Sequence, residues 1–74
     1  MNAKMVVARV FLYVRKLRRM SQDQLAAKLN VNESTIYKLE KGTEMPSIWV
    51  LQRLERLTNS SIKDLVAASR YANA

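Results

Sequence analysis

The chain has 74 residues, enough for one small domain and too few for a second. It contains no Cys and no His, which excludes disulfides, zinc fingers, imidazole catalysis and most transition-metal sites. Thirteen Lys and Arg against six Asp and Glu give a net charge of +7, which suits a DNA binder, an RNA binder or a membrane-surface peptide. Because the carboxylates are scattered and no phosphate-binding loop is present, we expect no enzyme, cofactor, metal or small-molecule ligand.

The first expected element is a helix in the apolar and basic stretch of residues 5–20. One side of this helix would carry five apolar residues, Val7, Val10, Phe11, Val14 and Leu17. Arg9 interrupts the apolar run, which is about half the length of a membrane span. The basic cluster comes last, unlike in a secretory signal. We therefore expect a core helix, with a helix lying on an anionic membrane as the alternative.

Residues 21–42 contain two short amphipathic segments separated by a brief turn. Their apolar residues follow the spacing of helices with one buried face and are Leu25, Ala26, Leu29, Ile36 and Leu39. Ala26 is small at the point where the two helices would cross closely. Two helices that cross steeply over a short turn form a helix-turn-helix, whose second helix fits the DNA major groove.

The turn between these helices is Asn30-Val31-Asn32. Asn30 can end the first helix in the left-handed conformation, and Asn32 is a preferred N-cap for the second. Val31 is expected to be buried in the turn. The alternative is an ordinary helical hairpin of a small bundle, which explains the periodicity but not this arrangement of Ser, Ala, Asn and Gly.

The remaining sequence predicts two further helices. Gly42 is expected to end the preceding helix, and Pro46 or Ser47 to start a fourth one. Its apolar positions are Ile48, Leu51, Leu54 and Leu57, with Trp49 or Val50 as an additional one. Residues 58–60 break it, although its end can be aligned in two registers between residues 54 and 62.

A fifth helix is expected to open at the capping-box sequence that runs from Ser61 to Asp64. Its apolar residues are Ile62, Leu65 and Val66. We expect the tail, residues 69–74, to be frayed.

These motifs resemble the phage repressor and Cro-type helix-turn-helix family, the XRE-like regulators, over about residues 7–65. The resemblance implies an all-α fold: a single compact five-helix domain of the lambda-repressor-like DNA-binding type over residues 1–74, with its motif at 21–42. It implies a cytoplasmic, nucleoid-associated regulator of bacterial or phage origin that binds a double-stranded operator. Such a regulator would be repressor-like, Cro-like or a restriction–modification controller. The alternative is an antitoxin-type interaction protein that also binds its own operator.

The resemblance assigns base reading to one face of the second motif helix. The matching positions are Glu33, Ser34 and Lys38, with Thr35 and Tyr37 at the edge of that face. Lys can donate to guanine O6 and N7, Glu can accept from cytosine N4, and Ser is compatible with several bases. An ordinary solvated helix face is the alternative for these residues.

The resemblance also places five residues near the DNA backbone: Gln22, Asn32, Lys41, Gly42 and Thr43. Gln22 would bind a phosphate and brace the reading helix, at a helix N-terminus whose dipole favours anions. Lys41 and its two neighbours would reach phosphate through side chains and main-chain N–H groups.

A structural ion pair between Arg15 and Glu40 is implied as well, since family members pair an Arg on the first helix with a Glu near the end of the reading helix. Two departures stand beside these matches. Asn30 replaces the Gly usual in the turn, and Arg19 stands where the loop before the second helix usually has Gly, so that loop is open to another path.

A homodimer is the expected working species, because one domain contacts only about four to six base pairs. The predicted interface comprises the apolar residues left over after Ile48, Leu51 and Leu54 close the core. These residues are Trp49, Val50, Val66 and Tyr71. The alternative is a slightly larger core that buries Trp49 and Val66 within one chain.

Overall fold

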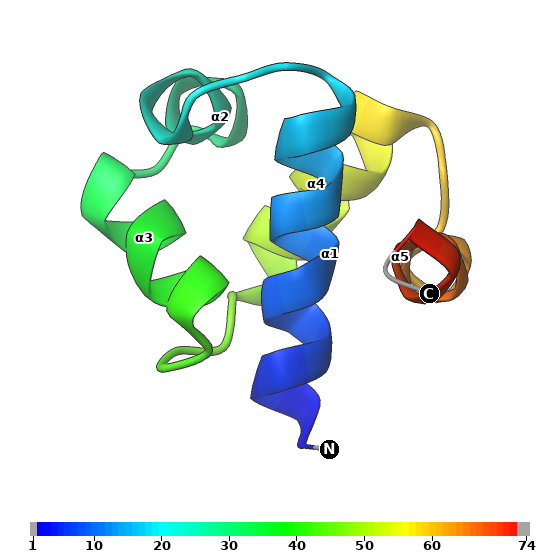
Figure 1. The fold of residues 1–74 in the computed structure, drawn as a ribbon. Helices are drawn as coiled ribbons and strands as arrows, with labels where there is room; N and C mark the ends of the chain where they lie inside the picture. The colour runs from blue at the N-terminus through cyan, green and yellow to red at the C-terminus, as the bar shows by residue number, and fades with distance from the viewer. Residues whose placement is uncertain (1, 73–74) are drawn as a thin grey trace.

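The computed structural model describes residues 2–72, and within that range the chain forms five helices and no strand. They are α1 (Ala3–Leu17), α2 (Gln22–Leu29), α3 (Glu33–Lys41), α4 (Ile48–Thr58) and α5 (Ile62–Ala72). Figure 1 shows α1 at the centre, with α2 and α3 on one side and α5 on the other. The predicted all-α, five-helix fold is confirmed. No helix in the described part of the chain is long and apolar enough to cross a membrane.

Short polar side chains fix where four of the helices begin. Asn2 accepts a hydrogen bond from the third residue of α1, at 2.8 Å. Ser21 and Gln24 form a complete capping box on α2, with each side chain bonded to the other's backbone N–H. Ser47 and Ser61 accept from backbone N–H groups in the first turns of α4 and α5. These bonds satisfy donors that have no partner inside a helix.

Left-handed residues fix where three helices end. Asn30, Gly42 and Asn59 follow α2, α3 and α4 with φ of 57°, 76° and 53°. Asn30 therefore ends α2 as predicted, and Asn59 decides between the two registers for the end of α4. Arg19, in the loop before α2, also has a positive φ of 54°. The loop thus adopts at Arg19 a conformation that Gly would adopt without strain.

The core lies where α1, α2, α3 and α4 meet, with Leu65 added from α5. Its largest fully buried hydrophobic side chains are Phe11, Leu25, Leu29, Ile36, Leu39, Leu54 and Val14. The buried faces predicted for the two motif helices are therefore confirmed. The core face of α1 also holds Val10 and Ala8, while Val7 packs at its edge.

Three expectations about the core were wrong. Ile48 is 63% exposed, whereas Val50, predicted as surplus interface, is only 5% exposed and belongs to the core. The buried stripe of α4 is formed instead by Val50 and Leu54, which are four residues apart and face the core together, while Ile48 points away from it. Leu17 is the last residue of α1 and is 66% exposed.

The expected fraying of the tail is also wrong as far as residue 72. Residues 69–72 continue α5, and Ser69 is 1% exposed with its hydroxyl bonded to the Val66 carbonyl at 2.8 Å. A small hydroxyl that bonds a carbonyl of the preceding turn is tolerated inside a helix. Residues 73 and 74 lie outside the described residues.

Candidate nucleic-acid interface

α2 and α3 form the predicted helix-turn-helix. Ala26 is 2% exposed and packs in the core, so its small size permits close approach of the two helices. The turn is closed by a backbone hydrogen bond from Val31 to Ala26 of 3.0 Å. Val31 is half-buried at the edge of the core rather than fully buried.

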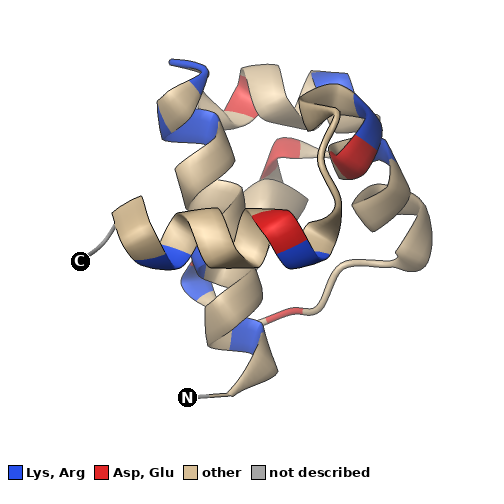
Figure 2. Ribbon diagram, turned by 90° about the vertical axis from the view of Figure 1, so that its right-hand side faces the viewer, with Lys and Arg blue, Asp and Glu red and all other residues tan. Residues whose placement is uncertain are grey.

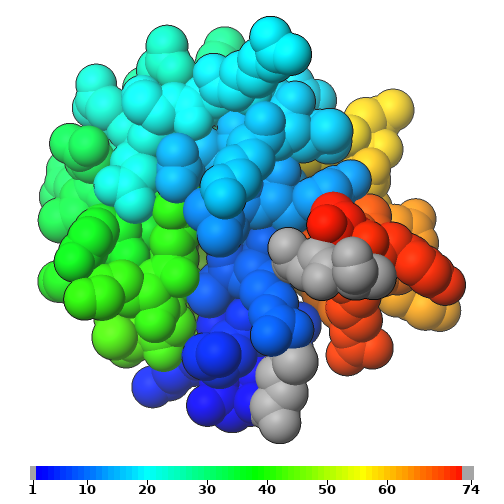
Figure 3. Space-filling model, viewed as in Figure 1, coloured from blue at the N-terminus to red at the C-terminus, as the bar shows by residue number. Residues whose placement is uncertain are grey.

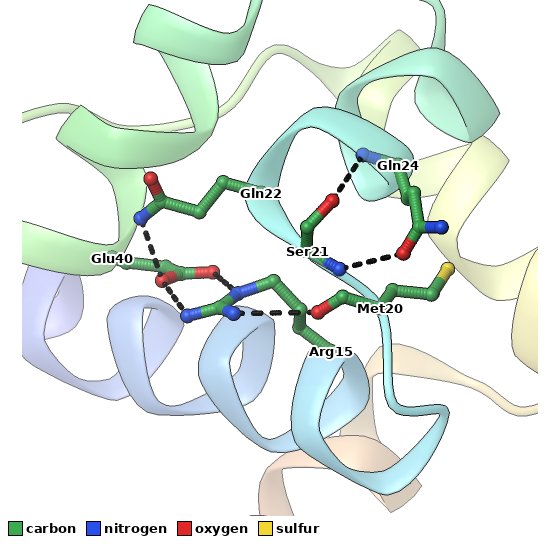
Figure 4. Close-up of polar contacts among 6 residues, drawn as sticks. All are labelled: Arg15, Met20, Ser21, Gln22, Gln24 and Glu40. Atoms are coloured by element: carbon green, nitrogen blue, oxygen red, sulfur yellow. Dashed lines mark hydrogen bonds and ion pairs between the residues drawn. The ribbon is translucent and has the colours of Figure 1, made fainter.

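An ion pair holds the end of α3 against α1. Arg15 binds Glu40 through two hydrogen bonds, Nε to Oε2 at 2.7 Å and Nη2 to Oε1 at 2.9 Å. Gln22, the first residue of α2, donates its side-chain amide to the same Oε1 at 3.1 Å (Figure 4). Arg15 also donates to the Met20 carbonyl at 3.3 Å, which the sequence could not reveal because the acceptor is backbone. Three helices are thus tied together at Glu40.

This contact is shielded from solvent on the carboxylate side. The Glu40 side chain is 7% exposed and that of Arg15 21%. The hydrogen bonds to Glu40 raise the pKa of Arg15, burial opposes this shift, and the charge of Glu40 adds to it. A bidentate Arg–carboxylate pair fixes relative orientation as well as distance. The arrangement therefore sets the angle of α3.

The opposite face of α3 is open to solvent. Glu33, Ser34, Tyr37 and Lys38 are exposed, and Thr35 is half-buried at the edge. The structure thus brings the five residues predicted to read bases onto one short helix whose other face is buried.

The predicted phosphate-binding residues lie at the two ends of α3 and at the start of α2. Asn32 occupies the N-cap position with an extended backbone, but its side chain makes no capping hydrogen bond and is exposed. Asn32 therefore occupies the predicted N-cap position of α3, without a capping hydrogen bond from its side chain. Thr43 donates its hydroxyl to the Lys38 carbonyl at 3.2 Å, which fixes the loop around Gly42.

One contact on this surface was not anticipated. The Lys41 ammonium lies 5.2 Å from the centre of the Tyr37 ring, within the range of a cation–π interaction. The signal was present in the sequence, since residues four apart on a helix are neighbours. The contact holds a cation beside an exposed aromatic ring at the end of α3.

Charge is spread over the whole molecule rather than confined to this surface. Figure 2 shows Lys and Arg on several helices, with fewer Asp and Glu among them. In residues 2–72, no three His, Cys, Asp or Glu side chains group in a way that could hold a metal ion.

A helix-turn-helix family model matches residues 12–65, most of the chain. The chain belongs to the XRE-type helix-turn-helix family of transcriptional regulators. It is similar to two proteins of Archaeoglobus fulgidus, each described as an uncharacterized HTH-type transcriptional regulator. The first is 41% identical over 46 residues, which are 62% of this chain and 66% of the relative. The second is 37% identical over 46 residues, which are 62% of this chain and 65% of the relative. The match thus spans just under two thirds of these relatives, and no solved structure matches the chain significantly.

Proposed function

We propose that this regulator binds double-stranded DNA sequence-specifically, with α3 in the major groove. The observation that carries the proposal is the contrast between the two faces of α3. Ile36 and Leu39 are fully buried and Glu40 is held by Arg15, while the opposite polar face is exposed. A reading helix must have its side chains accessible and its angle fixed, because base contacts depend on geometry.

Three exposed side chains supply the proposed base contacts. Lys38 donates to guanine O6 and N7, and Glu33 accepts from cytosine N4. Ser34 adapts to several bases. Thr35 and Tyr37 lie at the edge of this face, where a methyl group or a ring can contact the thymine methyl.

The proposed contacts to the DNA backbone surround this face. Gln22 has two amide hydrogens, of which one is donated to Glu40, so the second can reach a phosphate at the start of α2. Asn32, at the start of α3, approaches the DNA backbone. Lys41 and the main chain at Gly42 and Thr43 do so beyond its end. These contacts set the register of the protein on DNA without reading its sequence.

We propose regulation of the repressor, Cro or restriction–modification controller type, with a homodimer as the working species. Two-fold pairing places the reading helices about 34 Å apart, one turn of DNA. Trp49 is 64% exposed and Tyr71 83% exposed, and Val66 is half-buried at the edge of the core. With Val50 in the core, the exposed Ile48 takes its place beside Trp49 in the proposed interface.

Sedimentation across micromolar concentrations tests the dimer. We expect a dimer in the presence of a palindromic duplex, and its assembly should weaken when Trp49→Ser removes an exposed ring. Lys28→Ser, on α2, is the control. A protein that stays monomeric on a palindromic duplex would contradict the homodimer.

Selection from a pool of random duplexes tests DNA reading. We expect a recurrent sequence with two inverted half-sites, bound at least about a thousand times more tightly than a scrambled duplex of the same composition. Selection that yields no recurrent sequence would refute specific DNA binding.

A further inference from the structure

The flank of α1 that faces α5 is hollowed. One hollow of about 420 Å³ is lined by Arg9, Leu12, Tyr13, Lys16, Leu17 and Ala72. A second, of about 220 Å³, adjoins it, since Tyr13 and Leu17 line both. We call the two together the α1–α5 groove. Figure 3 shows α1, in blue, beside the orange and red of α5, with α3, in green, on the other side of α1.

The groove presents apolar side chains to solvent. Leu17 is 66% exposed, and Leu12 and Tyr13 are half-buried. Leu12, Tyr13 and Lys16 follow at helical spacing, so one face of α1 carries both the apolar wall and a cation. Covering this face would release water from apolar surface, which favours binding.

Cations predominate around these apolar side chains. Lys16 is exposed and lines the first hollow, and Arg18 lines the second; among the described residues that line the two hollows, the one carboxylate is that of Asp64. Arg18 is held in place by its hydrogen bond to the Leu57 carbonyl at 2.8 Å. The groove thus combines an apolar wall with a positive margin.

We propose that the α1–α5 groove docks an acidic amphipathic helix of a partner protein. One or two large aliphatic side chains of that helix fill the hollows, and its carboxylates face Lys16 and the neighbouring cations. This is the helix-in-groove mode, in which apolar anchors give affinity and charges give selectivity.

Charge selects this occupant over a second copy of the chain. Two copies that met at this groove would bring Lys16 and Arg18 of one copy against the same cations of the other. A nucleic acid would engage the cations but leave Leu17 and Leu12 uncovered. The proposal does not depend on DNA reading, because α3 and α5 lie on opposite sides of α1 (Figure 1) and the groove is on the α5 side.

The direct test uses a fluorescein-labelled amphipathic peptide of about 16 residues, with Leu on one face and Glu flanking it. The matched peptide has Lys in place of every Glu. We expect saturable binding of the acidic peptide and none of the basic one. Shifts in the amide resonances of the protein should be confined to residues of α1 and α5 that line the groove.

Matched variants locate the site. Lys16→Glu and Leu17→Ser should each weaken peptide binding about tenfold, by reversing a charge and by removing apolar contact. Lys28→Glu, on α2, makes the same charge change outside the groove. Met45→Ser removes another exposed apolar side chain, one that lies in the loop before α4 and is 46% exposed, and both controls should bind within about twofold of the parent. Because all four residues are exposed, the variants should remain folded, which circular dichroism checks.

Several results would overturn the proposal. These are absence of acidic-peptide binding, equal losses in the groove variants and their controls, or resonance shifts centred away from α1 and α5. If phosphatidylserine vesicles or a random duplex shift the groove residues while the peptide does not, the groove serves another class of partner and the proposal is wrong.

Discussion

The two flanks of α1 are built in opposite ways. Toward α3, Arg15 is bonded to a nearly buried Glu40 at 2.7 Å, and Gln22 joins the same carboxylate. Toward α5, two residues further along the same helix, Leu17 is left 66% exposed above a groove. A structure of this size can hold one neighbour of α1 at a fixed angle and leave the other side accessible. The difference suits the proposed reading of DNA on one side and the proposed docking of a partner on the other.

The largest effect on the free energy of unfolding is expected from variants on the α3 side of α1. Arg15→Ala and Glu40→Ala should each lower the free energy of unfolding by about 2 kcal/mol, because each leaves a shielded charge without its partner. The double variant should lose less than the sum of the two. Urea denaturation of the four proteins measures this. Lys16→Ala, next to Arg15 but on the open side, is the control and should change stability by less than about 0.5 kcal/mol.

If the two single losses are additive, Arg15 and Glu40 do not interact in solution. If Lys16→Ala lowers the free energy of unfolding as much as Arg15→Ala does, the two sides of α1 do not differ in their contribution to stability.

A smaller effect is expected at Gly42, which follows α3 and lies against the start of α1. Gly42→Ala should cost about 1 kcal/mol, since φ of 76° is strained for a residue with a side chain. Steric clash adds little, because the nearest atom to the new Cβ would be Met5 Sδ at 3.6 Å. Thermal unfolding checks this, and an unchanged melting temperature would show that the loop after α3 relaxes freely.

Arg19 provides the converse test. Arg19→Gly removes the conformational strain of a left-handed residue with a side chain, which costs the folded state roughly 1–2 kcal/mol. The glycine also makes the unfolded chain more flexible, which lowers the free energy of unfolding by roughly 0.5–1 kcal/mol. We therefore expect a net gain of about 0.5 kcal/mol in the free energy of unfolding. A loss of stability would mean that the Arg19 side chain contributes more than its backbone costs.

The smallest effect is expected on the open flank. Leu17→Ser should change stability by less than about 0.5 kcal/mol, although the periodicity of the sequence predicts a core residue there. Urea denaturation decides this too. A loss of 2 kcal/mol or so, of the size seen for a buried Leu, would show that the groove is closed in solution.

The sequence predicted the helix-turn-helix well because its signals are local. Asn30 ends α2 through its own backbone conformation, and Ala26 and Leu39 follow the spacing of their helices. The Arg15–Glu40 pair spans 25 residues, and the family resemblance supplied it where spacing alone could not. The exposure of the proposed reading face followed once the buried face was known.

The sequence predicted α4 and the end of α1 less well because burial there depends on neighbours. Ile48, Trp49 and Val50 are all apolar, and only the packing of α4 against the core decides that Val50 is the buried one. Leu17 continues the apolar stripe of α1 beyond the point where it is covered. The contact between Lys41 and Tyr37 follows their spacing but depends on the rotamers of two exposed side chains.

The central claim, that α3 reads bases while its end contacts the backbone, is tested by comparing Lys38→Ala with Lys41→Ala. Affinities are measured on the selected duplex and on its scrambled control at two salt concentrations. Lys38→Ala should lose about 1–3 kcal/mol on the selected duplex and little on the scrambled one. Lys41→Ala should weaken both duplexes alike and make binding less dependent on salt. Equal losses on both duplexes for Lys38→Ala would contradict the account.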